Sequence, residues 1–142
     1  MPSIQSDVRS IFGSQSEAIR TKDLDRLMSL YSPDVVYFDV VPPLQYAGTA
    51  ALRARFSQWF DGYKGAIGMD IRDLKISTSG DLAIAHWLSR ASGTLNNGRE
   101  VGFWVRATSC CHWSNHLWLI THEHVSLPAD LRTGSAAMDL VP

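Results

Sequence analysis

The chain has 142 residues, of which 45% are hydrophobic and 19% charged, and its formal net charge is −1. These values are typical of a soluble globular protein with one core. They predict a single domain over residues 1–142, with its core at about 5–130 and a C-terminal arm at about 129–142. No run of like charges is present, so no nucleic-acid or membrane partner is expected.

Further features of the sequence favour a cytoplasmic location. No stretch approaches the ~18 apolar residues of a spanning helix. The N-terminal segment, residues 1–7, has neither the basic nor the apolar region of a secretory signal. The two cysteines, Cys110 and Cys111, are adjacent and would point to opposite faces of a strand, so they do not form a disulfide framework.

The first half of the chain predicts helices around one strand. A helical stripe, ended by a break at Lys22-Asp23, is formed by Val8, Ile11, Phe12, Gln15 and Ile19. Asp23 can cap a second helix, whose apolar stripe is Leu24, Leu27, Met28 and Tyr31. Residues 35–41 are β-branched or aromatic for the most part and predict a strand. A third helix is expected over 50–63, with Leu52, Arg55, Phe56, Trp59 and Phe60 on one side.

The second half predicts four long antiparallel strands. They are expected at about 67–77, 81–92, 99–113 and 117–126, separated by turn residues. Helices that are segregated from an antiparallel meander indicate an α+β fold, with the helices on one face of a curved sheet. Such a sheet leaves a cone, and polar side chains are expected to converge at its open end.

The strand predicted at 117–126 carries two histidines. Period-two alternation puts His122 and His124 on one face, together with Trp118, Ile120 and Ser126. Two interpretations remain open: at least one imidazole lines a pocket as an acid, base or hydrogen-bonding group, or both bind a metal with Asp39 or His86 as a third ligand. Because nothing else has metal-ligand spacing, no metal is predicted. Glu123 falls on the opposite face and is expected to form a cross-strand or interface salt bridge.

Three further polar residues are candidates for the pocket. Asp39 ends an apolar strand, where it is either a buried proton acceptor or a residue that satisfies turn amides. Arg106 shares a strand face with Trp104 and stays charged, so it needs an anionic or carbonyl ligand, or an internal partner such as Asp39 or Glu123. His86 is either a hydrogen-bonded core histidine or part of the site.

The chain resembles the SnoaL-like branch of the NTF2-like superfamily over about residues 5–130. The resemblance is carried mainly by Phe103-Trp104-Val105-Arg106-Ala107-Thr108 and by Trp118-Leu119-Ile120-Thr121-His122-Glu123-His124-Val125-Ser126. It implies an α+β cone, with three N-terminal helices packed on a curved, mostly antiparallel sheet, and a homodimer packed through its sheet faces.

The resemblance also bears on the site. Asp39 matches the position of the general base in ketosteroid isomerase, whereas Gln15 stands where that family has a tyrosine, and residues 99–113 contain no Asp. Steroid isomerisation as such is therefore not expected. The set Arg106, His122 and His124 is more cationic and suits a carboxylate, an enolate or a carbonyl-bearing acid.

The resulting hypothesis is a small-molecule enzyme of the isomerase, cyclase or dehydratase type that needs no cofactor. Its catalytic residues would be Asp39, Arg106, His122 and His124. The residues expected to bind substrate are Gln15, Tyr37, Trp59, His86 and Trp104. The alternative is a non-catalytic ligand-binding or association module of the same fold, for which the distinguishing sign would be Asp39 already paired with Arg106.

Overall fold

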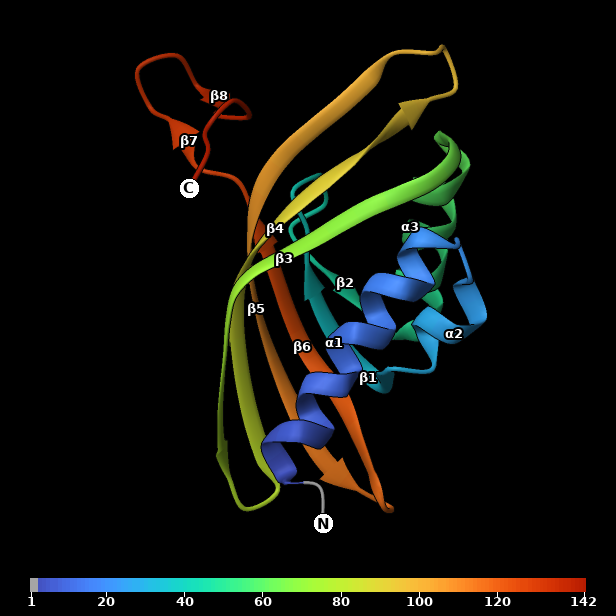
Figure 1. The fold of residues 1–142 in the computed structure, drawn as a ribbon, viewed down its shortest axis with the longest axis vertical. Coiled ribbons are helices and arrows are strands. Elements are labelled where there is room, and N and C mark those ends of the chain that lie inside the picture. Colours follow the sequence, from blue (N-terminus) through green and yellow to red (C-terminus); the bar gives the residue numbers. More distant parts are fainter. Residues whose placement is uncertain (1–2) are drawn as a thin grey trace.

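A computed structural model describes residues 3–142 of the chain, and Met1 and Pro2 of the N-terminal segment considered above lie outside the described residues. Figure 1 shows the helices beside a long curved sheet. The helices are α1 (Ile4–Arg20), α2 (Leu24–Met28) and α3 (Thr49–Asp61). The strands are β1 (Tyr31–Phe38), β2 (Tyr46–Ala47), β3 (Tyr63–Ser79), β4 (Leu82–Leu95), β5 (Glu100–Ser114), β6 (Leu117–Ser126), β7 (Ala129–Asp130) and β8 (Ser135–Ala136).

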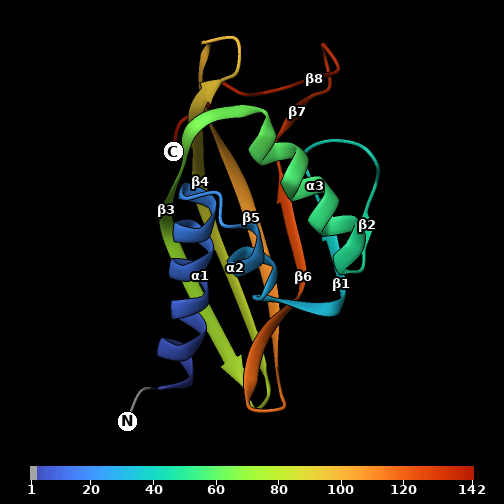
Figure 2. The same ribbon diagram turned by 90° about the vertical axis from the view of Figure 1, so that its right-hand side faces the viewer.

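Helix α1 forms where its apolar stripe predicts it. The Ser3 side chain accepts a hydrogen bond from the Ser6 amide and caps the first turn. The predicted stripe is buried along its length. The ring of Phe12 packs on Trp87 of β4, with a centroid distance of 4.7 Å. The helix therefore lies against the sheet, as Figures 1 and 2 show.

The expectation of three N-terminal helices is wrong. Only one long helix, α1, and one short helix, α2, precede the first strand, and α3 follows β1 and β2. Asp23 caps α2 as predicted, because its side chain accepts from the Arg26 amide. Tyr31, however, belongs to β1, where it pairs with Ile120 of β6. The chain therefore enters β1, and pairs with β6, almost directly after α2.

Six strands form one sheet in the order β2-β1-β6-β5-β4-β3. Every neighbouring pair is antiparallel except β1 and β6, which are parallel. The sheet curves around the helices, which cover only one of its faces (Figures 1 and 2). The curved, mostly antiparallel sheet of an α+β fold is therefore confirmed. We call the side that faces the helices the inner face and the other side the outer face.

A bulge in β6 decides which of its side chains face inward. Cys111 pairs with Ile120, but Cys110 pairs with His122, so Thr121 is an extra residue in the ladder. Because strand side chains alternate, one extra residue reverses the faces beyond it. Ile120 is buried on the inner face, and after the bulge Glu123 is the buried residue while His124 is exposed.

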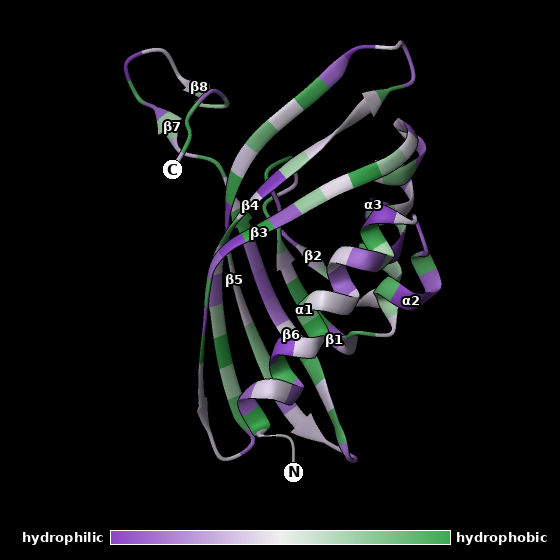
Figure 3. Cartoon of the chain, viewed as in Figure 1, coloured by the Kyte–Doolittle hydropathy of each residue, from purple (hydrophilic) through white to green (hydrophobic). Residues whose placement is uncertain are grey.

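Neighbouring strands show the same alternation without a break. Along β4 and β5 the buried residues are at odd positions, and the residues between them are more exposed. The inner residues of β4 include Ala83, Ala85 and Ser89, whose small side chains leave room for α1. Figure 3 shows the corresponding alternation of hydropathy along the long strands.

Beyond β6 the chain forms a short arm. Strands β7 and β8 pair only with each other in a two-stranded sheet. The arm projects from the end of β6 away from the three helices (Figure 1). Its Leu131 is 92% exposed. No helix in residues 3–142 combines the length and the apolar character needed to cross a membrane.

The contact between Phe12 and Trp87 predicts a large stability difference between two truncations. Phe12→Ala should lower the free energy of unfolding by about 3–5 kcal/mol, because it leaves a cavity in the core. Leu131→Ala, in the exposed arm, should change it by less than about 0.5 kcal/mol. Chemical denaturation of both variants measures the difference, and equal losses would contradict the packing described here.

Candidate functional site

A cavity of about 370 Å³ lies between the inner face of the sheet and the helices. Its volume falls in the range of small-molecule sites. Most of the wall is apolar, and its aromatic members are Tyr31, Tyr37, Phe56, Trp59, Tyr63, Trp87 and Phe103. Ala136 and Met138 of the arm also reach this wall. Such a lining suits a ligand with a flat, apolar body.

An ion pair forms one polar part of the wall. Arg55, on α3, donates from Nε to Asp39 Oδ2 at 2.7 Å, and the side chains are only 14% and 10% exposed. Asp39 directly follows β1, and its Oδ1 accepts from the Val40 amide at 2.6 Å. Strand β1 and helix α3 thus bring both charged groups to the cavity, where both are lining residues.

A second polar group centres on Glu123, which is 2% exposed and also lines the cavity. Gln15 Nε2 donates to both carboxylate oxygens, at 3.0 and 3.1 Å. The Tyr31 hydroxyl donates to Oε1 at 3.0 Å, and the Ser109 hydroxyl donates to Oε2. Four hydrogen bonds from α1, β1 and β5 therefore hold one buried carboxylate.

The surroundings of Glu123 shift several pKa values. Burial raises the pKa of Glu123 above 4.5, against the opposing effect of the hydrogen bonds from Ser109, Gln15 and Tyr31. Burial, and then the charge of Glu123, raise the pKa values of Tyr31 and Tyr37 well above 10. The same two causes raise the pKa of Cys111 to about 12. These hydroxyls and the thiol therefore stay protonated at neutral pH.

Two cavity-lining groups keep unused donors. Tyr37 is 6% exposed, and its hydroxyl makes no hydrogen bond to any residue in the described part of the chain. Arg55 uses only Nε among residues 3–142, so its terminal N–H groups stay available. Both side chains line the same cavity as Asp39. Hydrogen-bond donors beside a carboxylate are suited to a ligand carbonyl.

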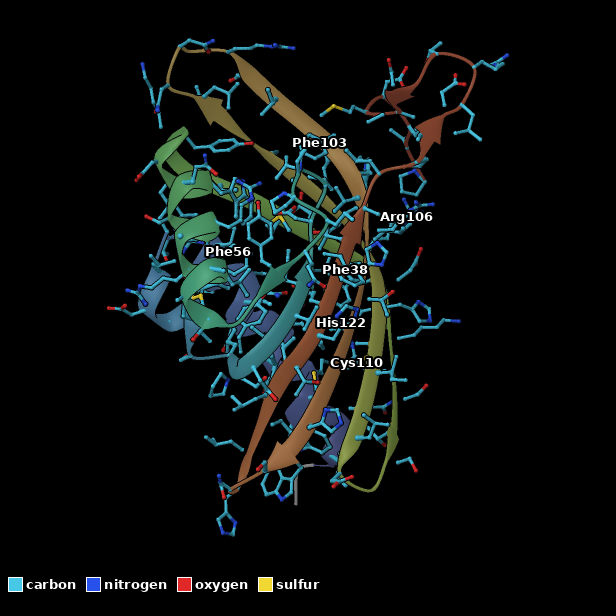
Figure 4. All side chains as sticks on the ribbon, turned by 180° about the vertical axis from the view of Figure 1, so that it is seen from behind. Phe38, Phe56, Phe103, Arg106, Cys110 and His122 are labelled. Carbon is cyan, nitrogen blue, oxygen red and sulfur yellow. The ribbon has the colours of Figure 1, made fainter. Side chains whose placement is uncertain are left out.

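The structure brings together only part of the site predicted from sequence. Asp39, Gln15, Tyr37 and Trp59 line the cavity. The remaining predicted residues lie on the outer face and do not line it: His86, Trp104, Arg106, His122 and His124. Figure 4 shows Arg106 on the side of the sheet away from Phe56 and α3.

Each outer-face residue has its own surroundings. Arg106 is exposed, and its Nε donates to the Ser126 hydroxyl at 3.3 Å, not to Asp39 or Glu123. His122 Nδ1 is hydrogen-bonded to the Val36 carbonyl oxygen at 2.7 Å. The rings of His122 and His124 contact Phe38, with centroid distances of 4.8 and 5.4 Å.

Two physical causes explain the misplacement. In β6, the bulge at Thr121 turns His122 and His124 outward and Glu123 inward, so the expected faces are wrong. The salt bridge expected for Glu123 is also wrong, because no cation of the described chain pairs with it. In β4 and β5, small inner residues such as Ala85 and Ala107 are buried, while His86 and Arg106 face outward.

Sequence reasoning missed Arg55, Ser109, Tyr31 and Glu123 as site residues. Arg55 had a visible signal, because it interrupts the apolar stripe of α3 between Leu52 and Phe56. The bulge had no such signal, because the residues before it, 117–120, are all apolar and do not alternate. No three His, Cys, Asp or Glu side chains of residues 3–142 form a group that could hold a metal ion.

Comparison with known proteins agrees with this architecture. The model of the SnoaL-like domain family matches residues 8–130. The chain belongs to the SnoaL-like branch of the NTF2-like superfamily. It is 30% identical to an NTF2-like protein of unknown function from Pseudomonas putida KT2440, with a TM-score of 0.89 over 97% of this chain and 96% of that one. No curated protein matches this SnoaL-like sequence.

Two more distant structures share the fold alone. A ketosteroid isomerase-like protein from Erwinia carotovora atroseptica SCRI1043 is 15% identical, with a TM-score of 0.76 over 89% of this chain and 97% of that one. A candidate dehydratase of the NTF2-like family from Streptomyces avermitilis is 18% identical, with a TM-score of 0.75 over 84% and 93% of the two chains.

The hydrogen bonds of Glu123 predict different effects for two tyrosine variants of this SnoaL-like protein. Tyr31→Phe removes one donor from a buried carboxylate and should lower the free energy of unfolding by about 1.5–3 kcal/mol. Tyr37→Phe removes a hydroxyl that has no protein partner and should cost less than about 0.5 kcal/mol. Urea denaturation near neutral pH compares them, and a smaller loss for Tyr31→Phe would contradict the network.

Proposed function

We propose that this protein is a cofactor-free enzyme that moves a proton next to a carbonyl group of a small, largely apolar substrate, as isomerases, cyclases and dehydratases do. Asp39 is the proposed base, and Arg55 stabilises the oxyanion that forms. The observation that carries the proposal is the buried Asp39–Arg55 pair, joined at 2.7 Å, in the wall of an apolar cavity.

Asp39 retains the capacity to accept a proton. Each oxygen of a carboxylate has two acceptor positions. Oδ1 receives one hydrogen bond, from the Val40 amide, and Oδ2 receives one, from Arg55. One acceptor position therefore remains on each oxygen. Glu123, by contrast, is surrounded by donors from Gln15, Tyr31 and Ser109, which makes it less suitable as the base.

Arg55 and Tyr37 supply donors for the developing negative charge. The terminal N–H groups of Arg55 have no partner in residues 3–142, and neither has the Tyr37 hydroxyl. When a base removes the proton beside a carbonyl, negative charge moves to the carbonyl oxygen. Donors held in a water-poor cavity stabilise such charge strongly. Arg55 thereby takes the role that sequence reasoning gave to Arg106.

The substrate class also changes. With Arg106, His122 and His124 in the pocket, the expected substrate is carbonyl-bearing or acidic. With all three on the outer face, Arg55 is the only cation among the described lining residues, and Asp39 already pairs with it. A neutral carbonyl compound therefore fits this wall better than an acid. The distant relatives described as ketosteroid isomerase-like and as a candidate dehydratase are compatible with carbonyl chemistry.

The competing proposal is a ligand-binding module without chemistry. Its distinguishing sign was an arginine paired with Asp39, and such a pair exists, although the partner is Arg55 and not Arg106. An ion pair that served only to close the cavity would also explain this contact. The two proposals differ in one respect, since only the enzyme exchanges protons with a bound ketone.

Hydrogen–deuterium exchange separates the two proposals. The wild type should accelerate exchange of the hydrogens beside the carbonyl of a bicyclic ketone such as 1-tetralone in D₂O, followed by NMR. Asp39→Asn should reduce that rate by about 100-fold or more, because it removes the base. Arg55→Gln should also reduce it, whereas Arg53→Gln, on the exposed side of the same helix, should not.

Arg53 provides a matched control for Arg55. Arg53→Gln removes the same charge from α3 but lies outside the cavity. If the wild type binds the ketone yet exchanges it no faster than Asp39→Asn, the enzymatic proposal is wrong and the binding module is supported.

We also propose that the protein is a homodimer joined through its outer sheet face. That face carries apolar side chains which the chain itself leaves uncovered: Ile84 is 44% exposed, and Phe38, Leu88 and Trp104 are partly exposed. Exposed apolar residues that gather on one face favour association. The histidines and Arg106 on the same face would then contribute to the interface and not to catalysis.

A charge on this face should separate the subunits. Ile84→Asp should convert the dimer into a monomer in light scattering coupled to gel filtration, because it buries an unpaired carboxylate in the interface. Leu44→Asp, at a residue that is 95% exposed in the loop before β2, should leave the mass unchanged. A wild-type monomer at micromolar concentration would contradict the proposal.

A further inference from the structure

Glu123 has no part in the proton transfer proposed above, yet it is the most deeply buried charged residue in the cavity wall. Four hydrogen bonds satisfy its oxygens. Among residues 3–142, no lysine, arginine or histidine lies within salt-bridge distance of it. Burying a carboxylate without a cationic partner costs folding free energy.

The geometry of the hydrogen bonds fits an ionised group. Gln15, Tyr31 and Ser109 all direct donors at the carboxylate, and together they reach both oxygens. A protonated carboxyl would turn its own O–H toward one of these donors. Because donors from three side chains already surround both oxygens, Glu123 is poorly placed to bind a ligand directly. It therefore acts on a ligand through its field and not through direct contact.

That field acts on the part of the cavity that holds the proposed base. Glu123 pairs with Tyr37 across β6 and β1, and Asp39 lies two residues beyond Tyr37. Burial is the main cause of the raised pKa of Glu123, and the charge of Asp39 adds to it, so the two carboxylates act on each other. Within a water-poor cavity, one charge has a strong effect on another. Asp39 and Arg55 offset each other, so the described polar wall has a net charge of about −1.

We propose that Glu123 is a specificity-determining residue that makes the cavity reject anionic ligands and accept neutral or cationic ones with an aromatic or similarly flat body. The aromatic wall supports the second half of this statement, because ring faces attract organic cations. Trp59, Tyr63 and Phe103 are the partly exposed members of that wall. The inference rests on the proposed function in taking this cavity as the site of a small-molecule ligand.

Three nearly isosteric probes separate charge from shape: 2-naphthoate, 2-naphthamide and 2-naphthamidine. Calorimetry at about pH 8 should show that the wild type binds the carboxylate at least about ten-fold more weakly than the amide, while the amidine binds at least as well as the amide. Glu123→Gln should bring the carboxylate to within about three-fold of the amide. The matched control Glu100→Gln, at an exposed residue on β5, should keep the wild-type order.

A second measurement needs no variant and covers the case that Glu123→Gln fails to fold. Naphthalene-2-sulfonate stays anionic at all relevant pH values. Lowering the pH from about 8 through the raised pKa of Glu123 should strengthen its binding to the wild type relative to the amidine, because protonation removes the charge of Glu123. The other titratable groups that face Glu123 are Tyr31, Tyr37, Cys111 and Asp39, the last paired with Arg55.

Three binding results would overturn the proposed role of Glu123. Equal or tighter binding of naphthoate by the wild type overturns the inference, as does an unchanged order in a folded Glu123→Gln variant. Binding of none of the three probes also overturns it, because the neutral and cationic members are required to bind. These readouts are affinities, so they stay distinct from the proton exchange that tests Asp39. The protein can prefer neutral over anionic ligands even if it does not exchange the protons of a ketone, and it can exchange those protons without such a preference.

Discussion

The site depends on the extra residue at Thr121 in β6. Strand alternation allows only one set of side chains to face the cavity, and the bulge changes that set halfway along the strand. Before it, Ile120 packs in the core, and beyond it, Glu123 and Val125 line the cavity. If β6 alternated regularly with Thr121 included in the ladder, His122 and His124 would face inward and Glu123 would face outward. The bulge therefore sets both the shape and the charge of the pocket.

The buried carboxylate that the bulge introduces is held by three separate parts of the fold. Gln15 comes from α1, Tyr31 from β1 and Ser109 from β5. These bonds offset the cost of burial, which on its own would be several kcal/mol for an ion. They also tie the N-terminal helix to the last long strand. The same network that supplies the cavity with its charge therefore contributes to holding the helical layer on the sheet.

Local patterns predicted the elements well, whereas face assignments in the sheet were less secure. The stripe from Val8 to Ile19 predicted α1, since helix periodicity is set by the residues themselves. The inward face of β4 was not readable in this way, because its small residues Ala83 and Ala85 make room for α1 while the larger Ile84 stays exposed. Asp39, Gln15, Tyr37 and Trp59 were predicted for the pocket and do line it. The role of Arg55 depends on the packing of α3 beside β1, and that of Glu123 on the register between β5 and β6.

The ionisation of Glu123 tests this account most directly. The chain has only three glutamates, Glu17, Glu100 and Glu123, so ¹³C NMR of the side-chain carboxyl carbons resolves a small set of signals. Burial raises the pKa of Glu123, and the hydrogen bond from Arg20 lowers that of Glu17. One signal, absent from Glu123→Gln, should therefore titrate above pH 4.5. If the signal that this variant removes titrates at or below 4.5, Glu123 is not buried in the cavity wall as described.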